Sequence, residues 1–102
     1  MDNQYLDGLM RPKSIAVLGA SSDPTKIGHS VIKNIIEGGY EGKIYPINLK
    51  SEEILGVKCY KSMLDVPGEI DAAVITIPAK FVLEAIEEAG KKGVKGLIII
   101  TS

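Results

Sequence analysis

Residues 14–48 decide the fold, and they read SIAVLGASSDPTKIGHSVIKNIIEGGYEGKIYPIN. The apolar run at 14–20 is short and ends in a glycine turn, which predicts a strand buried on both faces of a parallel sheet. After a polar loop, apolar residues at 27, 31, 32, 35 and 36 form one stripe and predict an amphipathic helix. Gly38 and Gly39 offer the left-handed residue that commonly ends a helix. The run at 43–48 then predicts a second strand, parallel to the first.

The chain after residue 48 continues to alternate between apolar runs and helical spacing. The expected elements are a helical turn at 51–55, a strand at 57–60, a brief helix at 61–66, a strand at 71–77, a helix from 81 to Gly90 or Gly93, and a strand at 96–101. Five parallel strands in the order 3-2-1-4-5, with helices on both faces, make a Rossmann-like, doubly wound α/β fold.

Composition limits the classes of protein that remain. The 102 residues carry a formal net charge of −1, so no basic surface indicates nucleic acid or anionic lipid. Cys59 is the only cysteine, which excludes an intramolecular disulfide and a thiolate metal cluster and favours a reducing cytoplasm. Residues 1–8 are polar and acidic, unlike a secretory signal peptide. We expect an amino-terminal arm at 1–11 and one domain at 12–102. Because the chain stops directly after a buried type of strand, we expect a fragment of a larger protein.

The loop after the first strand is the first candidate binding element. Ligands of open parallel sheets bind at the carboxyl ends of the strands. Gly19 removes a side chain where the backbone turns, and Ser21 and Ser22 offer hydroxyls before a helix amino terminus, an arrangement that suits a phosphate. The alternative is an ordinary polar loop in which Asp23 and Pro24 start the helix. The dinucleotide pattern G-x-G-x-x-G is absent.

The end of the second strand indicates which nucleotide binds. An NAD-binding chain normally places Asp or Glu there, whereas this chain has Asn48 and Lys50. A cation at this place attracts a phosphate on the ribose, which coenzyme A carries at its 3′ position and NADP at its 2′ position. Plain NAD is disfavoured. The alternative is that Lys50 is a solvated loop lysine.

Two single residues have ordinary structural interpretations. His29 lies early in the first helix with no nucleophile close in sequence, so a residue beside the phosphate cleft is favoured over a general base. Cys59 has apolar neighbours and is expected to be a packed small side chain. No pattern predicts a metal site or a catalytic residue, so binding is better supported than catalysis.

Three runs together carry a resemblance to a known family. They are PKSIAVLGASSDPTKIGHSVIKNIIEGGYEGKIYPIN, EEILGVKCYKSMLDVPGEIDAAVITIPAKFV and GVKGLIIITS, which cover the chain from Pro12 to its end. They resemble the amino-terminal coenzyme A-binding domain of ADP-forming acyl-CoA (acetyl-CoA) synthetases. The sequence is more distantly similar to the α subunit of succinyl-CoA ligase and to small stand-alone CoA-binding proteins.

The resemblance implies roles for residues at four strand ends. The loop that cradles the phosphates matches Gly19, Ala20, Ser21 and Ser22. The strand end that meets the adenosine ribose and its 3′-phosphate matches Asn48 and Lys50. The turn that borders adenine and pantetheine matches Pro78, Ala79 and Lys80. The end along the pantetheine arm matches Thr101 and Ser102. One departure is Leu49, where the family often has proline.

The resemblance also implies partners. The family's full enzyme interconverts acyl-CoA, ADP and phosphate with free acid, CoA and ATP through a phosphohistidine that lies in another domain, so His29 is not that residue. This chain is then expected to bind coenzyme A without catalysing the reaction, beside other synthetase domains that include an ATP-grasp unit. Two alternatives stay open, a CoA- or nucleotide-sensing regulatory domain (stand-alone or fused to an acyltransferase) and a fragment of an NADP-dependent oxidoreductase. Self-association through the open fifth strand is also left open.

Overall fold

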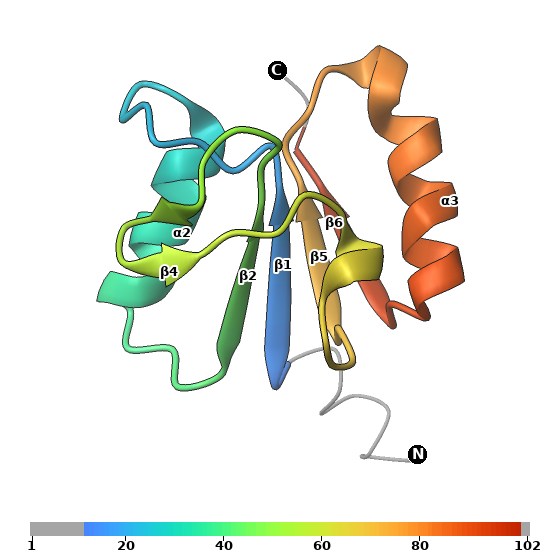
Figure 1. Cartoon of the computed structure of the whole chain (residues 1–102), viewed down its shortest axis with the longest axis horizontal. Coiled ribbons are helices and arrows are strands. Elements are labelled where there is room, and N and C mark those ends of the chain that lie inside the picture. Colours follow the sequence, from blue (N-terminus) through green and yellow to red (C-terminus); the bar gives the residue numbers. More distant parts are fainter. Residues whose placement is uncertain (1–11, 101–102) are drawn as a thin grey trace.

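A parallel four-stranded sheet forms the centre of the molecule (Figure 1). The computed structural model describes residues 12–100. The strands are β1 (Ser14–Leu18), β2 (Lys43–Ile47), β5 (Ala72–Ile75) and β6 (Gly96–Ile99). They lie in the order β2-β1-β5-β6, and all three pairings are parallel. The doubly wound Rossmann-like fold predicted from the sequence is confirmed.

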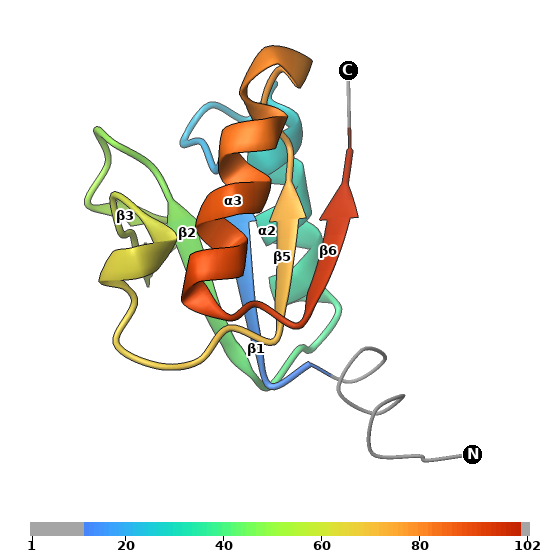
Figure 2. The same cartoon turned by 90° about the vertical axis from the view of Figure 1, so that its right-hand side faces the viewer.

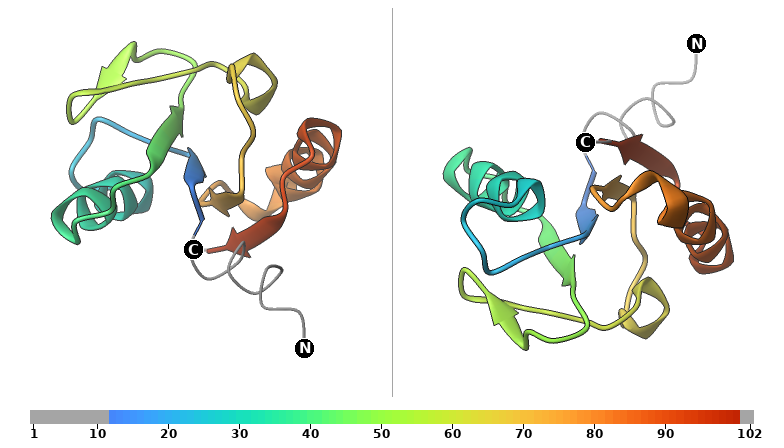
Figure 3. Two further views of the ribbon diagram at one scale, coloured as in Figure 1. Left: turned by 90° about the horizontal axis from the view of Figure 1, so that it is seen from below. Right: turned by 90° about the horizontal axis from the view of Figure 1, so that it is seen from above.

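The two long helices cover opposite faces of this sheet. Helix α2 (Ile27–Glu37) lies on one side and helix α3 (Val82–Lys92) on the other, as the views along the strands show (Figure 3). Because successive strand residues point to opposite faces, Val17 packs with Ile32 on the α2 side, whereas Ala16 and Leu18 pack on the α3 side. Each face of the sheet therefore has its own apolar cluster.

The segment between β2 and β5 differs from its prediction. The helical turn expected at 51–55 is wrong, because β3 (Glu53–Ile54) pairs antiparallel with β4 (Val57–Lys58). Leu55 and Gly56 have φ angles of 52° and 81°, the positive values of a two-residue hairpin turn. The strand expected at 57–60 is divided: its first half belongs to the hairpin, and only Tyr60 reaches the main sheet, through one parallel bridge to Ile47. The central sheet consequently has four strands instead of five, although Tyr60 keeps the outer place beside β2 expected for the third strand.

The ends of the helices follow the sequence signals. Gly39, two residues after the end of α2, has φ +80°, and Gly93, directly after α3, has φ +82°. The brief helix expected at 61–66 is η1 (Met63–Asp65), a single turn whose Leu64 N–H donates to Ser62 Oγ at 3.1 Å. A second short turn, η2 (Ala79–Phe81), leads into α3 at the top of Figure 2. None of the helices described within residues 12–100 is long and apolar enough to cross a membrane.

Candidate functional site

The carboxyl ends of β1, β2 and β5 meet at one edge of the sheet, at the top of Figure 1. A hollow of about 350 Å³ opens there between the loops that follow these strands. Its lining residues are Leu18, Gly19, Ala20, Ile47, Asn48, Leu49, Lys50, Lys61 and Ile77. The structure therefore brings together four residues predicted as site residues, Gly19, Ala20, Asn48 and Lys50.

Gly19 is required by the turn itself. Its φ of +83° lies in the left-handed region that favours glycine. An added Cβ would lie 2.4 Å from Thr76 Oγ1, a hydroxyl that donates to Leu18 O at 2.7 Å. The missing side chain thus lets β1 turn tightly against the end of β5. A direct approach of Gly19 to a phosphate stays a prediction.

Gly28 is a site-forming residue that sequence reasoning missed. A Cβ on Gly28 would lie 1.9 Å from Gly19 O and 2.6 Å from Gly19 C. The first turn of α2 therefore rests directly on the backbone of the β1–α2 loop. The available signal was a glycine in the first turn of a helix, where it is a poor helix former and needs a packing reason. Lys26, at the N-cap, makes no side-chain cap hydrogen bond.

Asn48 ties two loops together. Its Nδ2 donates to Ala20 O at 2.7 Å, across to the β1–α2 loop. Its Oδ1 accepts the backbone N–H groups of Lys50 and Ser51, both at 2.7 Å. We call this set of three hydrogen bonds the Asn48 latch. Because both ends of the amide are engaged within the chain, Asn48 shapes the hollow as a positioning residue.

Local hydrogen bonds also order the β1–α2 loop. His29 Nδ1 lies 2.9 Å from Ser21 O and donates to it, since a carbonyl oxygen can only accept. Ser21 Oγ accepts Asp23 N–H at 3.0 Å. Asp23 Oδ1 accepts the Thr25 N–H and hydroxyl, at 2.9 and 2.8 Å, and these bonds, with the backbone one first, lower the pKa of the Asp23 carboxyl. His29 therefore supports the loop, and Ser22 stays exposed beside it.

Two cations reach the hollow. Lys50 was predicted from the end of the second strand, and Lys61 was not. Lys61 follows Tyr60, which the parallel bridge to Ile47 holds beside β2. No acidic side chain lines the hollow. Within residues 12–100 the one ion pair within 4.0 Å joins Lys95 and Asp71, at the opposite edge of the sheet.

The remaining predicted residues lie around this site or outside the described chain. Pro78 precedes η2, and Ala79 and Lys80 lie in that turn, exposed; the Lys80 Nζ is 5.1 Å from the centre of the Phe81 ring. None of the three lines the hollow, which takes Ile77 from this loop instead. Thr101 and Ser102 lie outside the described residues. The roles of all five in binding stay predictions.

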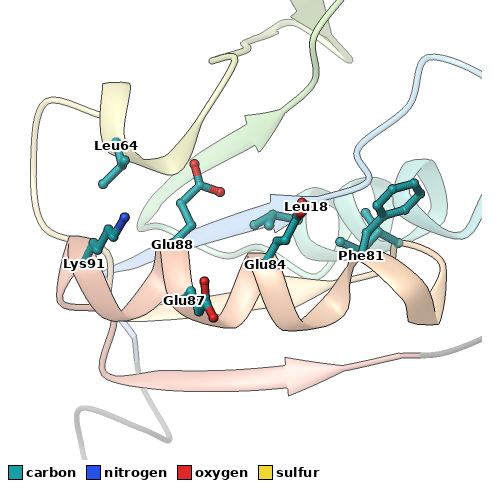
Figure 4. Close-up of a pocket in the computed structure, with 9 residues that line it drawn as sticks. Leu18, Leu64, Phe81, Glu84, Glu87, Glu88 and Lys91 are labelled. Carbon is teal, nitrogen blue, oxygen red and sulfur yellow. The ribbon is translucent and has the colours of Figure 1, made fainter.

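A second hollow of about 410 Å³ adjoins the first and has the opposite charge (Figure 4). The two share Leu18 and Ile77 as lining residues. Glu84, Glu87 and Glu88 of α3 project into this second space with Lys91, so it does not attract anions. Of these two hollows, only the first has charged lining residues that are all basic.

The fold and the hollow together define a nucleotide-binding domain of the Rossmann type, with ligand space at the carboxyl edge of a parallel sheet. The chain belongs to the family described as "CoA binding domain", whose sequence model matches residues 13–102. The resemblance stated from the sequence is thereby confirmed.

The relatives include acetate–CoA ligases and smaller proteins. The α subunit of acetate–CoA ligase [ADP-forming] I of Pyrococcus furiosus is 55% identical over 101 residues, 95% of this chain and 22% of the relative. The structure of Ca. Korarchaeum cryptofilum dinucleotide-forming acetyl-coenzyme A synthetase 1, in complex with phosphate and ADP, matches with a TM-score of 0.92 and 47% identity, over 95% of this chain and 21% of that chain.

A solved hypothetical protein of Pyrococcus horikoshii matches with a TM-score of 0.78 and 34% identity, over 100% of this chain and 84% of that chain. This chain thus spans about a fifth of the curated ligase subunits that it matches, but most of that smaller protein. It is a CoA-binding domain homologous to part of the ADP-forming acetate–CoA ligases.

Proposed function

We propose that this chain holds coenzyme A with its phosphates at the carboxyl edge of the sheet. The observation that carries the proposal is the hollow that joins Gly19, Asn48 and Lys50, three residues from two different loops. The Asn48 latch fixes the two loops relative to each other, and Lys50 supplies a positive charge that has no carboxylate partner among residues 12–100. This combination suits a nucleotide with a phosphate on its ribose.

The same proposal assigns parts of the ligand to parts of the site. The β1–α2 loop, from Gly19 to Ser22, contacts the pyrophosphate, and Lys50 contacts the ribose 3′-phosphate. Pro78, Ala79 and Lys80 border the adenine and the pantetheine arm, which continues toward Thr101 and Ser102. Support comes from the family match and, for the residues from Gly19 to Lys80, from their position after the carboxyl ends of parallel strands.

We further propose that the chain works as one unit, at 12–102 with its arm at 1–11, of an ADP-forming acyl-CoA synthetase. Support comes from the curated relatives, of which this chain spans about a fifth. The remaining domains, with an ATP-grasp unit among them, then supply the chemistry, and this chain supplies coenzyme A. The cytoplasm as its location and self-association through β6 stay predictions.

A second candidate is a stand-alone regulatory domain that senses coenzyme A. The small protein of Pyrococcus horikoshii favours it, since this fold accounts for most of that chain. A longer reading frame that carries an ATP-grasp segment favours the synthetase, and a frame that ends near residue 102 or carries an acyltransferase favours the sensor.

The experiment is calorimetric titration of the 102-residue chain with coenzyme A, dephospho-CoA and NADP, after circular dichroism has shown that it is folded. Tightest binding of coenzyme A is the expected result. Tighter binding of NADP would assign the site to a dinucleotide. Absence of binding by the folded chain would refute coenzyme A binding by this domain.

A further inference from the structure

Lys61 lies where it can act on the same part of a ligand as Lys50. It lines the hollow of the proposed site together with Lys50. Both lysines also line an adjoining depression of about 670 Å³, bounded by the β3–β4 hairpin. They are the two residues of basic charge common to the two spaces, and they approach the boundary from different segments of the chain.

The backbone before Lys61 is held firmly. Tyr60 N–H donates to Pro46 O, and Tyr60 O accepts Asn48 N–H, both at 2.9 Å. The Tyr60 ring also meets the buried Tyr45 ring edge to face, with the ring centres 5.6 Å apart. Lys50 is fixed from the other side, because its own N–H donates to Asn48 Oδ1. Asn48 therefore holds the chain next to both lysines, one through its backbone and the other through its side chain.

The charges around the two lysines leave them open to an anion. No carboxylate lines the hollow, and none of the described residues forms an ion pair with Lys50 or Lys61. Glu52 and Glu53 line only the adjoining depression. Two like charges beside one space repel each other, and an anion held between them removes that repulsion. A phosphate monoester, which carries about two negative charges at pH 7, suits two cations better than a singly charged diester does.

We infer that Lys61 is a second specificity-determining residue, which together with Lys50 binds the 3′-phosphate monoester of coenzyme A. The inference rests on the proposed function. It adds that two lysines together discriminate between coenzyme A and dephospho-CoA. Neither lysine alone accounts for the preference for coenzyme A over dephospho-CoA. The two contributions are coupled, because both ammonium groups contact one phosphate.

The test is a set of titrations with coenzyme A and with dephospho-CoA. The variants are Lys50→Ala, Lys61→Ala and the double variant, with Lys33→Ala as a matched control that removes an exposed lysine of α2 far from the hollow. Each single variant is expected to weaken binding of coenzyme A about 10- to 100-fold and to leave binding of dephospho-CoA nearly unchanged. The double variant should bind the two ligands about equally, and Lys33→Ala should bind both like the parent chain.

The outcomes separate the inference from the proposed function. If the parent chain binds coenzyme A tightly but Lys61→Ala keeps its preference over dephospho-CoA, the inference is wrong and the function stands. Equal losses for both ligands in Lys61→Ala also overturn it, because the lysine then acts on a part that both ligands share. If the parent chain binds neither ligand, the proposed function fails first. Because Lys61 is exposed, thermal unfolding of the variant should match the parent chain, which confirms that affinity and not folding has changed.

Discussion

The contact between Gly28 and the β1–α2 loop predicts opposite effects for the same substitution in two helices. Gly28→Ala and Gly90→Ala both replace a helical glycine with a better helix former, a gain of about 1 kcal/mol in each case. At Gly90 nothing lies within 4 Å of the added Cβ, so the full gain should appear. At Gly28 the Cβ would lie 1.9 Å from Gly19 O, whereas real Cβ atoms essentially never come within 3.0 Å of such an atom.

The helix and the loop must therefore separate by about 1 Å or more in Gly28→Ala, and the atoms involved are backbone, which cannot rotate away. Overpacking of this kind costs about 1–3 kcal/mol or more, which exceeds the helical gain. For a domain of this size, 1 kcal/mol corresponds to about 4–8 °C in Tm. We expect Gly90→Ala to raise Tm by about 4–8 °C. In Gly28→Ala a cost near the upper end of this range, about 3 kcal/mol, less the gain of about 1 kcal/mol, leaves a net loss of about 2 kcal/mol and a fall in Tm of about 8–16 °C.

Thermal unfolding followed by circular dichroism measures both changes, and titration with coenzyme A then reports on the displaced loop. Affinity should fall in Gly28→Ala and stay unchanged in Gly90→Ala, which lies at the far end of α3 from the site. An equal rise of Tm in both variants would refute the reasoning, since it would mean that α2 does not rest on the loop.

Three further outcomes are expected. Asn48→Asp keeps the oxygen that accepts the Lys50 N–H but loses the N–H group that donates to Ala20 O. The free energy of unfolding, measured in urea, should therefore fall by about 1–3 kcal/mol. An unchanged free energy of unfolding would contradict the Asn48 latch. Ser14→Ala leaves the buried Asp71 N–H without its acceptor and should cost about 1–3 kcal/mol in urea unfolding, more than any change in the Lys33→Ala control. Burial raises the pKa of the Cys59 thiol, so iodoacetamide should alkylate the folded chain at pH 8 more slowly than the urea-unfolded chain, and a faster reaction of the folded chain would contradict this.

The main sheet could be predicted because its strands carry their own signal. The mainly apolar runs at 14–20 and 71–77 are longer than a turn and therefore predict buried strands. Glycines follow both long helices and predict where they end. The hairpin could not be predicted in the same way. β3 and β4 have two residues each, too few to show a period, and the expected helical turn at 51–55 included Leu55, the first residue of the hairpin turn.

The site residues that follow strand ends could be predicted from the sequence, whereas those that depend on tertiary contacts could not. The parallel topology places the carboxyl ends of neighbouring strands together. Four predicted residues follow these ends and line the same hollow: Gly19, Ala20, Asn48 and Lys50. Lys61 reaches the same hollow because Tyr60 forms a parallel bridge to Ile47, and no local sequence pattern predicts this contact. The contact of Asn48 with the adenosine ribose stays a prediction, and the hydrogen bonds of its amide to backbone groups of the chain itself were not foreseen.

The Asn48 latch has a consequence for the thermodynamics of association. Loops that become ordered only around a ligand lose conformational entropy at that moment, which lowers affinity. Here three hydrogen bonds within the chain join the loops after β1 and β2, so that part of this entropy is lost when the chain folds. For the proposed ligand we therefore expect a preorganised surface and binding without a slow rearrangement of these two loops.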